Sequence, residues 1–185
     1  METIENITIQ QYFSLEDATS YDIFLDVMNP ENLFCGKKCN VSSLTFDEIQ
    51  VTRKILSNPN TEDIKDLYLM LFGVRGDMDN SPDELFLNES VFQLFKATNF
   101  IKDFIGKINK KEAEWLSGDK SDVLEMLNAS NRLAPFNHLL QKTDLAQMFG
   151  TTPDEIGSWK YSKVFIILAS QKVRNEIQKE FNEIK

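Results

Sequence analysis

The chain has 185 residues, of which 42% are hydrophobic, and it carries a formal net charge of −9. This apolar fraction is typical of a globular protein and argues against intrinsic disorder, while seven Gly and five Pro provide little turn material for an all-β sandwich or barrel. The acidic charge argues against a general DNA or RNA binder, because affinity for phosphates needs a cationic surface. We therefore expect an all-α protein.

Residues 1–44 form the least regular part of the sequence, and we expect an irregular N-terminal arm. Ile7, Ile9, Tyr12 and Phe13 either begin a short strand or pack an extended arm onto a neighbouring molecule. Residues 21–28 are typical of a short helix that ends before Pro30. The acidic N-terminal sequence does not resemble a secretory signal, and no apolar run approaches the ~20 residues that cross a bilayer. We expect neither secretion nor a membrane anchor, and a location in the host cytoplasm or in a particle assembled there.

Two cysteines, Cys35 and Cys39, flank Gly36 and two lysines. A structural zinc site needs four ligands, and this sequence has no third Cys and a single distant His. We expect two reduced thiols around a turn at Gly36 and no metal. A disulfide stays open as an alternative, although nothing in the sequence indicates an oxidising compartment.

Capping sequences predict where several helices begin. A Ser or Thr followed three residues later by Glu forms a capping box, and Pro fits the first helical position. Helices are therefore expected after Thr45, Ser81 and Thr152, and a further one from Thr61 to Phe72 that Gly73 closes. The apolar residues between Ser81 and Leu116 are too dense for one narrow stripe and predict one central helix, or two in line.

The remaining helices are predicted from shorter patterns. Ser121 can cap a short helix, residues 131–142 have helical apolar spacing, and Thr143 and Asp144 predict a new helix from Leu145 to Phe149. A long last helix is expected from about Tyr161. We divide the chain into the arm (1–44), a helical core (45–142) and a C-terminal part (143–185), which together form one globular unit.

No pattern in the sequence provides a catalytic, cofactor-binding or metal-binding residue. The acidic loop from Asp77 has Pro82 and Asn88 where an EF-hand needs Gly and Glu. His138 has no neighbouring carboxylate to act as a catalytic partner, and four acidic pairs fall in first turns of predicted helices, where they complement the helix dipole. We expect a non-enzymatic protein; a pocket that gathers several carboxylates around His138 would instead favour an enzyme of unrecognised type.

Residues 144–159 resemble a helix-turn-helix motif. Ala146 occupies the position where two helices pack closely, Gly150 lies in the turn, Ile156 is the inward apolar residue and Trp159 closes the unit. The motif implies a DNA-binding regulator. However, Asp154 and Glu155 would face the groove and repel phosphate, so we expect no DNA contact.

The same region has a second resemblance. The run Asp144-Leu-Ala-x-x-Phe-Gly-x-Thr-Pro-Asp-Glu-Ile, followed by Trp159, Tyr161-Ser162 and the apolar run from Val164 to Leu168, is similar to the C-terminal part of small helical tail-assembly proteins of bacteriophages. The resemblance covers about 40 residues. It implies a structural component of a phage tail or neck, such as a ring or adaptor, or alternatively a transient tail-assembly chaperone, with other virion or assembly proteins and further copies of itself as partners.

The predicted last helix carries an apolar seam. Ile166, Val173, Ile177, Phe181 and Ile184 recur at intervals of seven, four, four and three residues, and charged residues fill the other sides. The seam either packs on the core of its own chain or, in its part beyond Ile177, contacts another subunit. The residues predicted to contact partners are Ile7, Ile9, Tyr12, Phe13, Trp159, Tyr161, Val173, Ile177, Phe181 and Ile184.

Overall fold

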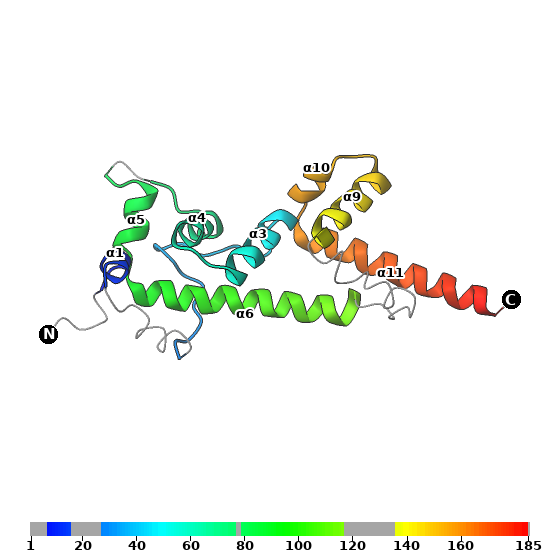
Figure 1. Ribbon diagram of the computed structural model, residues 1–185, viewed down its shortest axis with the longest axis horizontal. Helices are drawn as coiled ribbons and strands as arrows, with labels where there is room; N and C mark the ends of the chain where they lie inside the picture. Colours follow the sequence, from blue (N-terminus) through cyan, green and yellow to red (C-terminus); the bar gives the residue numbers. More distant parts are fainter. Residues whose placement is uncertain (1–6, 16–26, 77–78, 117–135, 185) are drawn as a thin grey trace. The chain divides into compact units, whose positions relative to one another are not determined.

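The structure is a computed structural model that describes residues 7–15, 27–76, 79–116 and 136–184 (Figure 1). Its regular structure in these residues is helical, which confirms the all-α prediction, and chain segments pair elsewhere only as isolated bridges such as Thr8–Ser90. The helices are α1 (Ile9–Phe13), α3 (Phe46–Ser57), α4 (Thr61–Phe72), α5 (Pro82–Asn88), α6 (Val91–Leu116), α9 (Asn137–Phe149), α10 (Pro153–Ser158) and α11 (Tyr161–Glu183). The helices predicted over residues 21–28 and after Ser121 lie outside the described residues.

The chain forms two compact units that are discontinuous in sequence. Unit 1 comprises Met1–Val41 and Val51–Lys107, and unit 2 comprises Ser42–Gln50 and Ile108–Lys185. Two of the three boundaries between them fall inside α3 and α6, and they differ from the predicted divisions after residues 44 and 142. None of the described helices combines the length and the apolarity that crossing a membrane requires.

Helix caps fix the ends of the elements of unit 1. Ser81 and Glu84 form the predicted capping box, in which each side chain accepts from the other residue's backbone N–H, and Pro82 is the first helical residue. Hydrogen bonds from the Ser81 backbone N–H and from the Ser81 side chain to the Glu84 carboxyl lower the pKa of this group. Helix α4 begins at Thr61 as predicted, with Asn60 as its cap, and ends at Gly73, whose φ of 61° is the left-handed conformation of a helix C-cap.

An aromatic cluster forms the centre of unit 1. The ring of Phe34 contacts those of Tyr68, Phe72 and Phe86 at centroid distances of 4.9, 5.6 and 5.5 Å. The four residues come from the segment before α3, from α4 and from α5, so they join parts of the chain that are far apart in sequence. Burying such rings is the main favourable contribution to this core.

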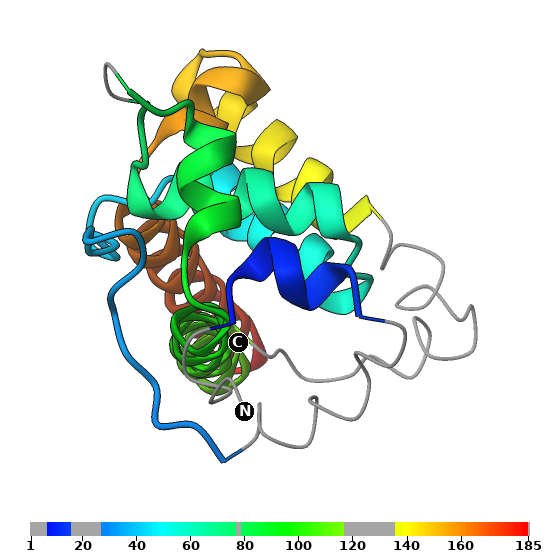
Figure 2. The ribbon, with the colours of Figure 1, turned by 90° about the vertical axis from the view of Figure 1, so that its left-hand side faces the viewer.

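The N-terminal segment is a helix and not the predicted strand or extended arm. Thr8 and Gln11 form a capping box that begins α1, and Ile9 and Tyr12 are buried. Among the described residues, the only strand-like pairing of this segment is an isolated bridge to the residues before α6. In this bridge Ile9 N donates to Glu89 O, and Val91 N donates to Ile7 O. Helix α1 consequently lies beside α5 (Figure 2).

The central apolar segment is divided at Glu89 and Ser90. Glu89 has extended backbone angles and ends α5, and Ser90 Oγ accepts from Phe92 N at the start of α6. The alternative of two helices is therefore correct, but α5 and α6 are not in line (Figure 1). The pairing with residues 7–9 satisfies the backbone at this break.

Unit 2 is built around a small apolar core. Phe46, Leu145, Ala146, Ile156 and Val164 are buried together, and Trp159, Tyr161, Ile167 and Leu168 pack against them. Thr45 and Glu48 form the predicted capping box at the start of α3, which brings Phe46 into this core. The predicted helix start at Thr143 is wrong: α9 continues through it, because the Thr143 hydroxyl donates to Leu139 O within the helix.

Candidate protein-interaction surface on the C-terminal helix

The first turns of α11 are anchored in unit 2. Val164 is fully buried in the core, Tyr161 N donates to Leu44 O, and the Tyr161 hydroxyl donates to Glu112 Oε1 at 2.7 Å. Trp159 lies between the Phe149 ring, with centroids 5.3 Å apart, and the Lys163 ammonium, which stands over its face. Trp159 and Tyr161, both predicted to contact a partner, thus hold the start of α11 in place.

The rest of α11 exposes the predicted seam. Ile166 is 63% exposed, Val173 42%, Ile177 60%, Phe181 53% and Ile184 85%. We call these five residues, together with the exposed Ser170 among them, the α11 stripe. Packing on the core of its own chain would remove most of this area from water, so these exposures do not support that alternative for the seam.

The geometry of the α11 stripe follows from the spacing of its residues. With Ser170 included, five intervals separate Ile166 from Ile184, which lies eighteen positions later. The mean interval is 3.6 residues, which equals the period of a straight α-helix. The six side chains therefore stay within a sector of about 80° and extend over about 27 Å. Glu180 follows Ile177 by three residues and precedes Ile184 by four, so its carboxylate borders the stripe.

The N-terminal residues predicted to contact partners divide into two groups. Ile9 and Tyr12 are buried in unit 1, with 0% and 8% exposure, so they belong to its core. Ile7 is partly exposed and its carbonyl pairs with Val91, while Phe13 is 39% exposed at the end of α1. These residues belong to unit 1, whereas the α11 stripe belongs to unit 2.

The helix-turn-helix-like segment has the predicted local geometry. Gly150 ends α9 in the left-handed conformation, Ala146 and Ile156 are buried where α9 and α10 pack, and Thr152 Oγ1 accepts from Glu155 N at the start of α10. The third capping box is only half formed, since the Glu155 carboxylate accepts from the Thr151 hydroxyl. Helix α10 has six residues, about 9 Å, with Asp154 and Glu155 exposed. Both its length and its charge disfavour a recognition helix.

An ion pair that the sequence analysis did not predict holds α9, α10 and the start of α3 together. Lys142 Nζ donates to Asp47 Oδ1 and Oδ2 at 3.0 and 2.9 Å, and the Lys142 side chain is only 11% exposed. The Asp47 carboxylate lies directly over Gly157 of α10, where any Cβ would overlap it. The two charged residues are 95 positions apart, and the only sequence signal is a glycine inside a short helix.

The cysteines form the predicted turn. Phe34 and Lys37 exchange two backbone hydrogen bonds, and Cys35 and Gly36 between them have φ values of 45° and 67°, as in a type I′ turn. Cys35 and Cys39 are not joined by a disulfide. Burial, followed by the neighbouring Glu89 carboxylate, raises the pKa of the Cys35 thiol to about 12, which keeps it protonated and unreactive near neutral pH.

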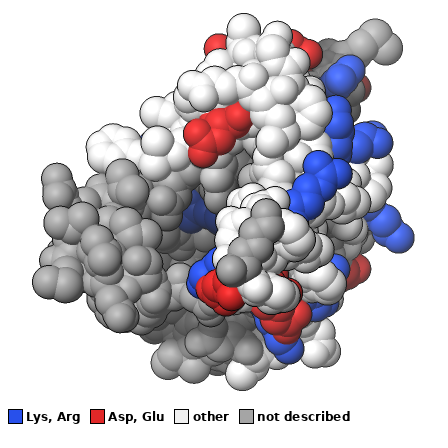
Figure 3. Space-filling model, turned by 90° about the vertical axis from the view of Figure 1, so that its right-hand side faces the viewer, with Lys and Arg blue, Asp and Glu red and all other residues white. Residues whose placement is uncertain are grey.

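The described residues contain no group of three or more His, Cys, Asp or Glu side chains placed to hold a metal ion. The prediction for the His138 side chain lies outside the described residues. The face seen in Figure 3 carries both acidic and basic side chains among uncharged ones. Comparison of the chain with protein-family models, with curated proteins and with solved structures finds no match.

Proposed function

We propose that this chain is a non-enzymatic assembly protein that acts through protein–protein contacts of the α11 stripe. The observation that supports it is the exposure of Ile166, Ile177 and Ile184 on one face of a helix whose first turns are fixed in a core. Burying this apolar face against another protein would be favourable by about 25 cal/mol for each Å² removed from water. Self-association or docking on another protein is the function that uses this surface.

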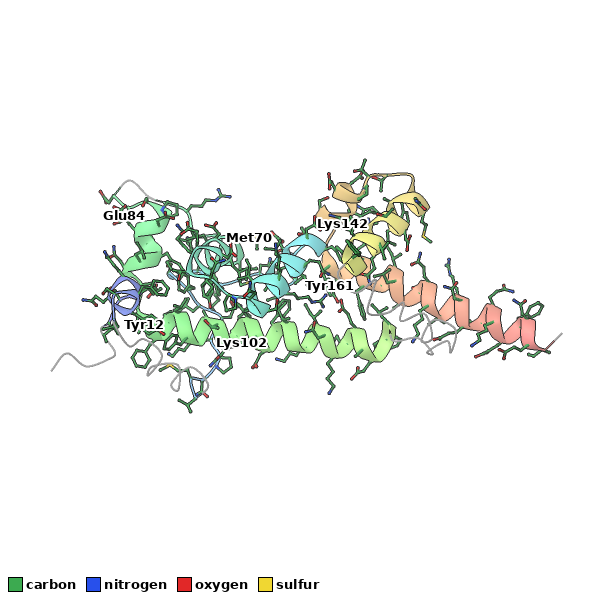
Figure 4. All side chains as sticks on the ribbon, viewed as in Figure 1. Tyr12, Met70, Glu84, Lys102, Lys142 and Tyr161 are labelled. Carbon is green, nitrogen blue, oxygen red and sulfur yellow. The ribbon has the colours of Figure 1, made fainter. Side chains whose placement is uncertain are left out.

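The test is the oligomeric state of the full chain at rising concentration. We expect the wild-type chain to form oligomers as its concentration rises to about 100 μM, the range suited to interfaces below the standard size. We expect the double variant Ile177→Ser, Ile184→Ser to stay monomeric over the same range. Met70→Ser is the matched control, because Met70 is an apolar residue of α4 that is 38% exposed outside the stripe (Figure 4). A wild-type chain that stays monomeric and binds no virion protein encoded beside its gene would contradict the proposal.

We further propose that the setting is the assembly of a phage tail or neck, with this chain as a ring or adaptor component. The support is the resemblance of residues 144–168 to phage tail-assembly proteins, together with the all-α fold. A transient tail-assembly chaperone is the alternative within this setting. Mass spectrometry of purified particles separates the two, because a ring or adaptor stays in the particle and a chaperone does not.

A second candidate function is binding of duplex DNA by α9 and α10. The turn at Gly150 and the packing of Ala146 against Ile156 favour it, and the exposed Asp154 and Glu155 oppose it. If these helices enter a groove, Asp154→Lys with Glu155→Lys strengthens salt-sensitive binding to duplex DNA. Binding that is absent in wild type and in this variant excludes the candidate.

A further inference from the structure

Unit 1 contains an apolar groove that the proposed function does not use. It has a volume of about 500 Å³ and is lined by residues of α1, α3, α4 and α6, among them Tyr12, Phe13, Leu67, Phe95 and Lys102. Tyr12 and Lys102 are labelled in Figure 4. An apolar cavity of about 150 Å³ holds one benzene ring, so the groove has room for roughly three side chains of that size.

Two hydroxyl groups of the groove already bond within the protein. The buried Tyr68 hydroxyl is hydrogen-bonded to Thr98 Oγ1, and the Thr98 hydroxyl donates to Leu94 O at 2.7 Å. The floor therefore offers no unsatisfied donor or acceptor at these hydroxyls to a polar ligand. An occupant that supplies apolar side chains fits this chemistry better than a small polar molecule.

The groove and the α11 stripe have complementary charges. Lys102 is exposed and is the only charged residue among those that line the groove in the described part of the chain. On the α11 stripe, Glu180 borders Ile177 and Ile184 along one edge, and Arg174 borders Ser170 and Ile177 along the other. The edge that carries the Glu180 carboxylate matches an apolar groove bordered by an ammonium group.

Pairing of two α11 stripes with each other is the less favourable arrangement. A coiled coil needs an apolar seam that repeats every 3.5 residues, whereas the α11 stripe repeats every 3.6 and contains Ser170 near its middle. A stripe with a period of 3.6 runs straight along its helix, so it does not provide the seam around which two helices supercoil. A concave groove can cover the large side chains at Ile177, Phe181 and Ile184 without this requirement.

We propose that the α11 stripe of one copy docks into the unit 1 groove of a second copy, with Ile177 and Phe181 in the groove and Glu180 facing Lys102. This inference rests on the proposed function and specifies its partner. The two surfaces are different, so the contact is heterologous: each copy donates a stripe and accepts one. Repetition of such a contact gives a ring when the rotation closes and an open filament when it does not.

The test mixes two variants that each lack one surface. The stripe variant carries Ile177→Ser and Ile184→Ser, and the groove variant carries Phe13→Ser and Lys102→Glu, all at residues that are exposed. We expect each variant alone to be monomeric by sedimentation, and an equimolar mixture to form a one-to-one dimer and nothing larger, because one intact stripe then meets one intact groove. Circular dichroism establishes that each variant is folded.

The outcomes separate this inference from the proposed function. A groove variant that still forms oligomers like wild type overturns the groove as acceptor and leaves the α11 stripe as the assembly surface. A mixture that stays monomeric also overturns the inference. A wild-type chain that does not self-associate overturns the inference. If that chain binds another protein through the α11 stripe, the proposed function is retained.

A charge reversal tests the docking contact independently of the apolar substitutions. Lys102→Glu and Glu180→Lys are each expected to weaken self-association about threefold, and their combination in one chain is expected to restore it. Lys54→Glu, on the exposed surface of α3 and outside the groove lining, is the control for the change in net charge. Failure of the double variant to recover contradicts the pairing of these two charges.

Discussion

At the scale of single residues, Gly157 is the position where one methyl group has the clearest consequence. The Asp47 carboxylate occupies the space of its missing Cβ and binds Lys142 through both oxygens. An alanine there displaces the carboxylate and leaves the ammonium of Lys142, which is only 11% exposed, without this partner. The glycine is thus required by a close approach and not by its backbone angles.

We therefore predict that Gly157→Ala lowers the free energy of unfolding by about 1–3 kcal/mol, although alanine is the better helix former. In an Asp47→Ala background the same substitution has no carboxylate to displace, and it becomes neutral or stabilising. Chemical denaturation of the four variants measures this coupling as a double-mutant cycle. Equal effects in both backgrounds would contradict the arrangement of Asp47 over Gly157.

At the scale of elements, the capping box at the start of α5 makes the stability of unit 1 depend on pH. Ser81 lowers the pKa of Glu84 through its backbone and side-chain hydrogen bonds. A carboxyl whose pKa is lowered by folding contributes stability above its unfolded pKa, near 4.5, and loses it as the pH falls through the folded value.

We predict that Glu84→Gln lowers the melting temperature at pH 7 and has almost no effect near pH 2.5, where the protonated Glu84 resembles glutamine. Asp66→Asn, at an exposed residue of α4, is a control for the loss of one carboxylate. Thermal denaturation of the three proteins across this pH range measures the effect. A difference between wild type and Glu84→Gln that is independent of pH would count against the capping interaction as its source.

Helix starts were predictable where the signal is local. The caps at Thr45 and Ser81 depend on residues three positions apart, and the sequence shows both partners. The break at Glu89 depends on backbone bonds to residues 7–9, some eighty residues away, so it was not evident from its own neighbourhood. The helix at Ile9–Phe13 does have a local signal, the capping box of Thr8 and Gln11, and the prediction missed it. Thr143 shows the converse: a residue typical of a cap lies inside a helix when its hydroxyl bonds to the preceding turn.

The candidate surface was predictable in part for the same reason. The α11 stripe is a property of one helix, and its spacing is visible in the sequence. Whether the stripe is buried depends on what the rest of the chain places against it, and the exposures of Ile177 and Ile184 answer this for the described residues. The groove of unit 1 needs residues from four helices, and no sequence period predicts it.

At the scale of the whole molecule, charge opposes the contact that the apolar surface favours. Residues 1–100 carry 17 acids and 7 bases, and residues 101–185 carry 12 acids and 13 bases, so the excess of nine negative charges lies in the first part of the chain. Two copies that approach each other repel through this net charge, and the repulsion adds to the free energy of self-association. Lowering the pH toward the isoelectric point, near 4.7, reduces it.

We predict that self-association tightens by roughly three- to tenfold between pH 7.5 and pH 5.0 at low salt. The pH effect should vanish at about 1 M salt, where the screening length is about 3 Å. Sedimentation at each pH measures the dissociation constant, and the Ile177→Ser, Ile184→Ser variant must stay monomeric at pH 5.0. If that variant associates equally, the oligomers arise from nonspecific aggregation near the isoelectric point and not from the α11 stripe.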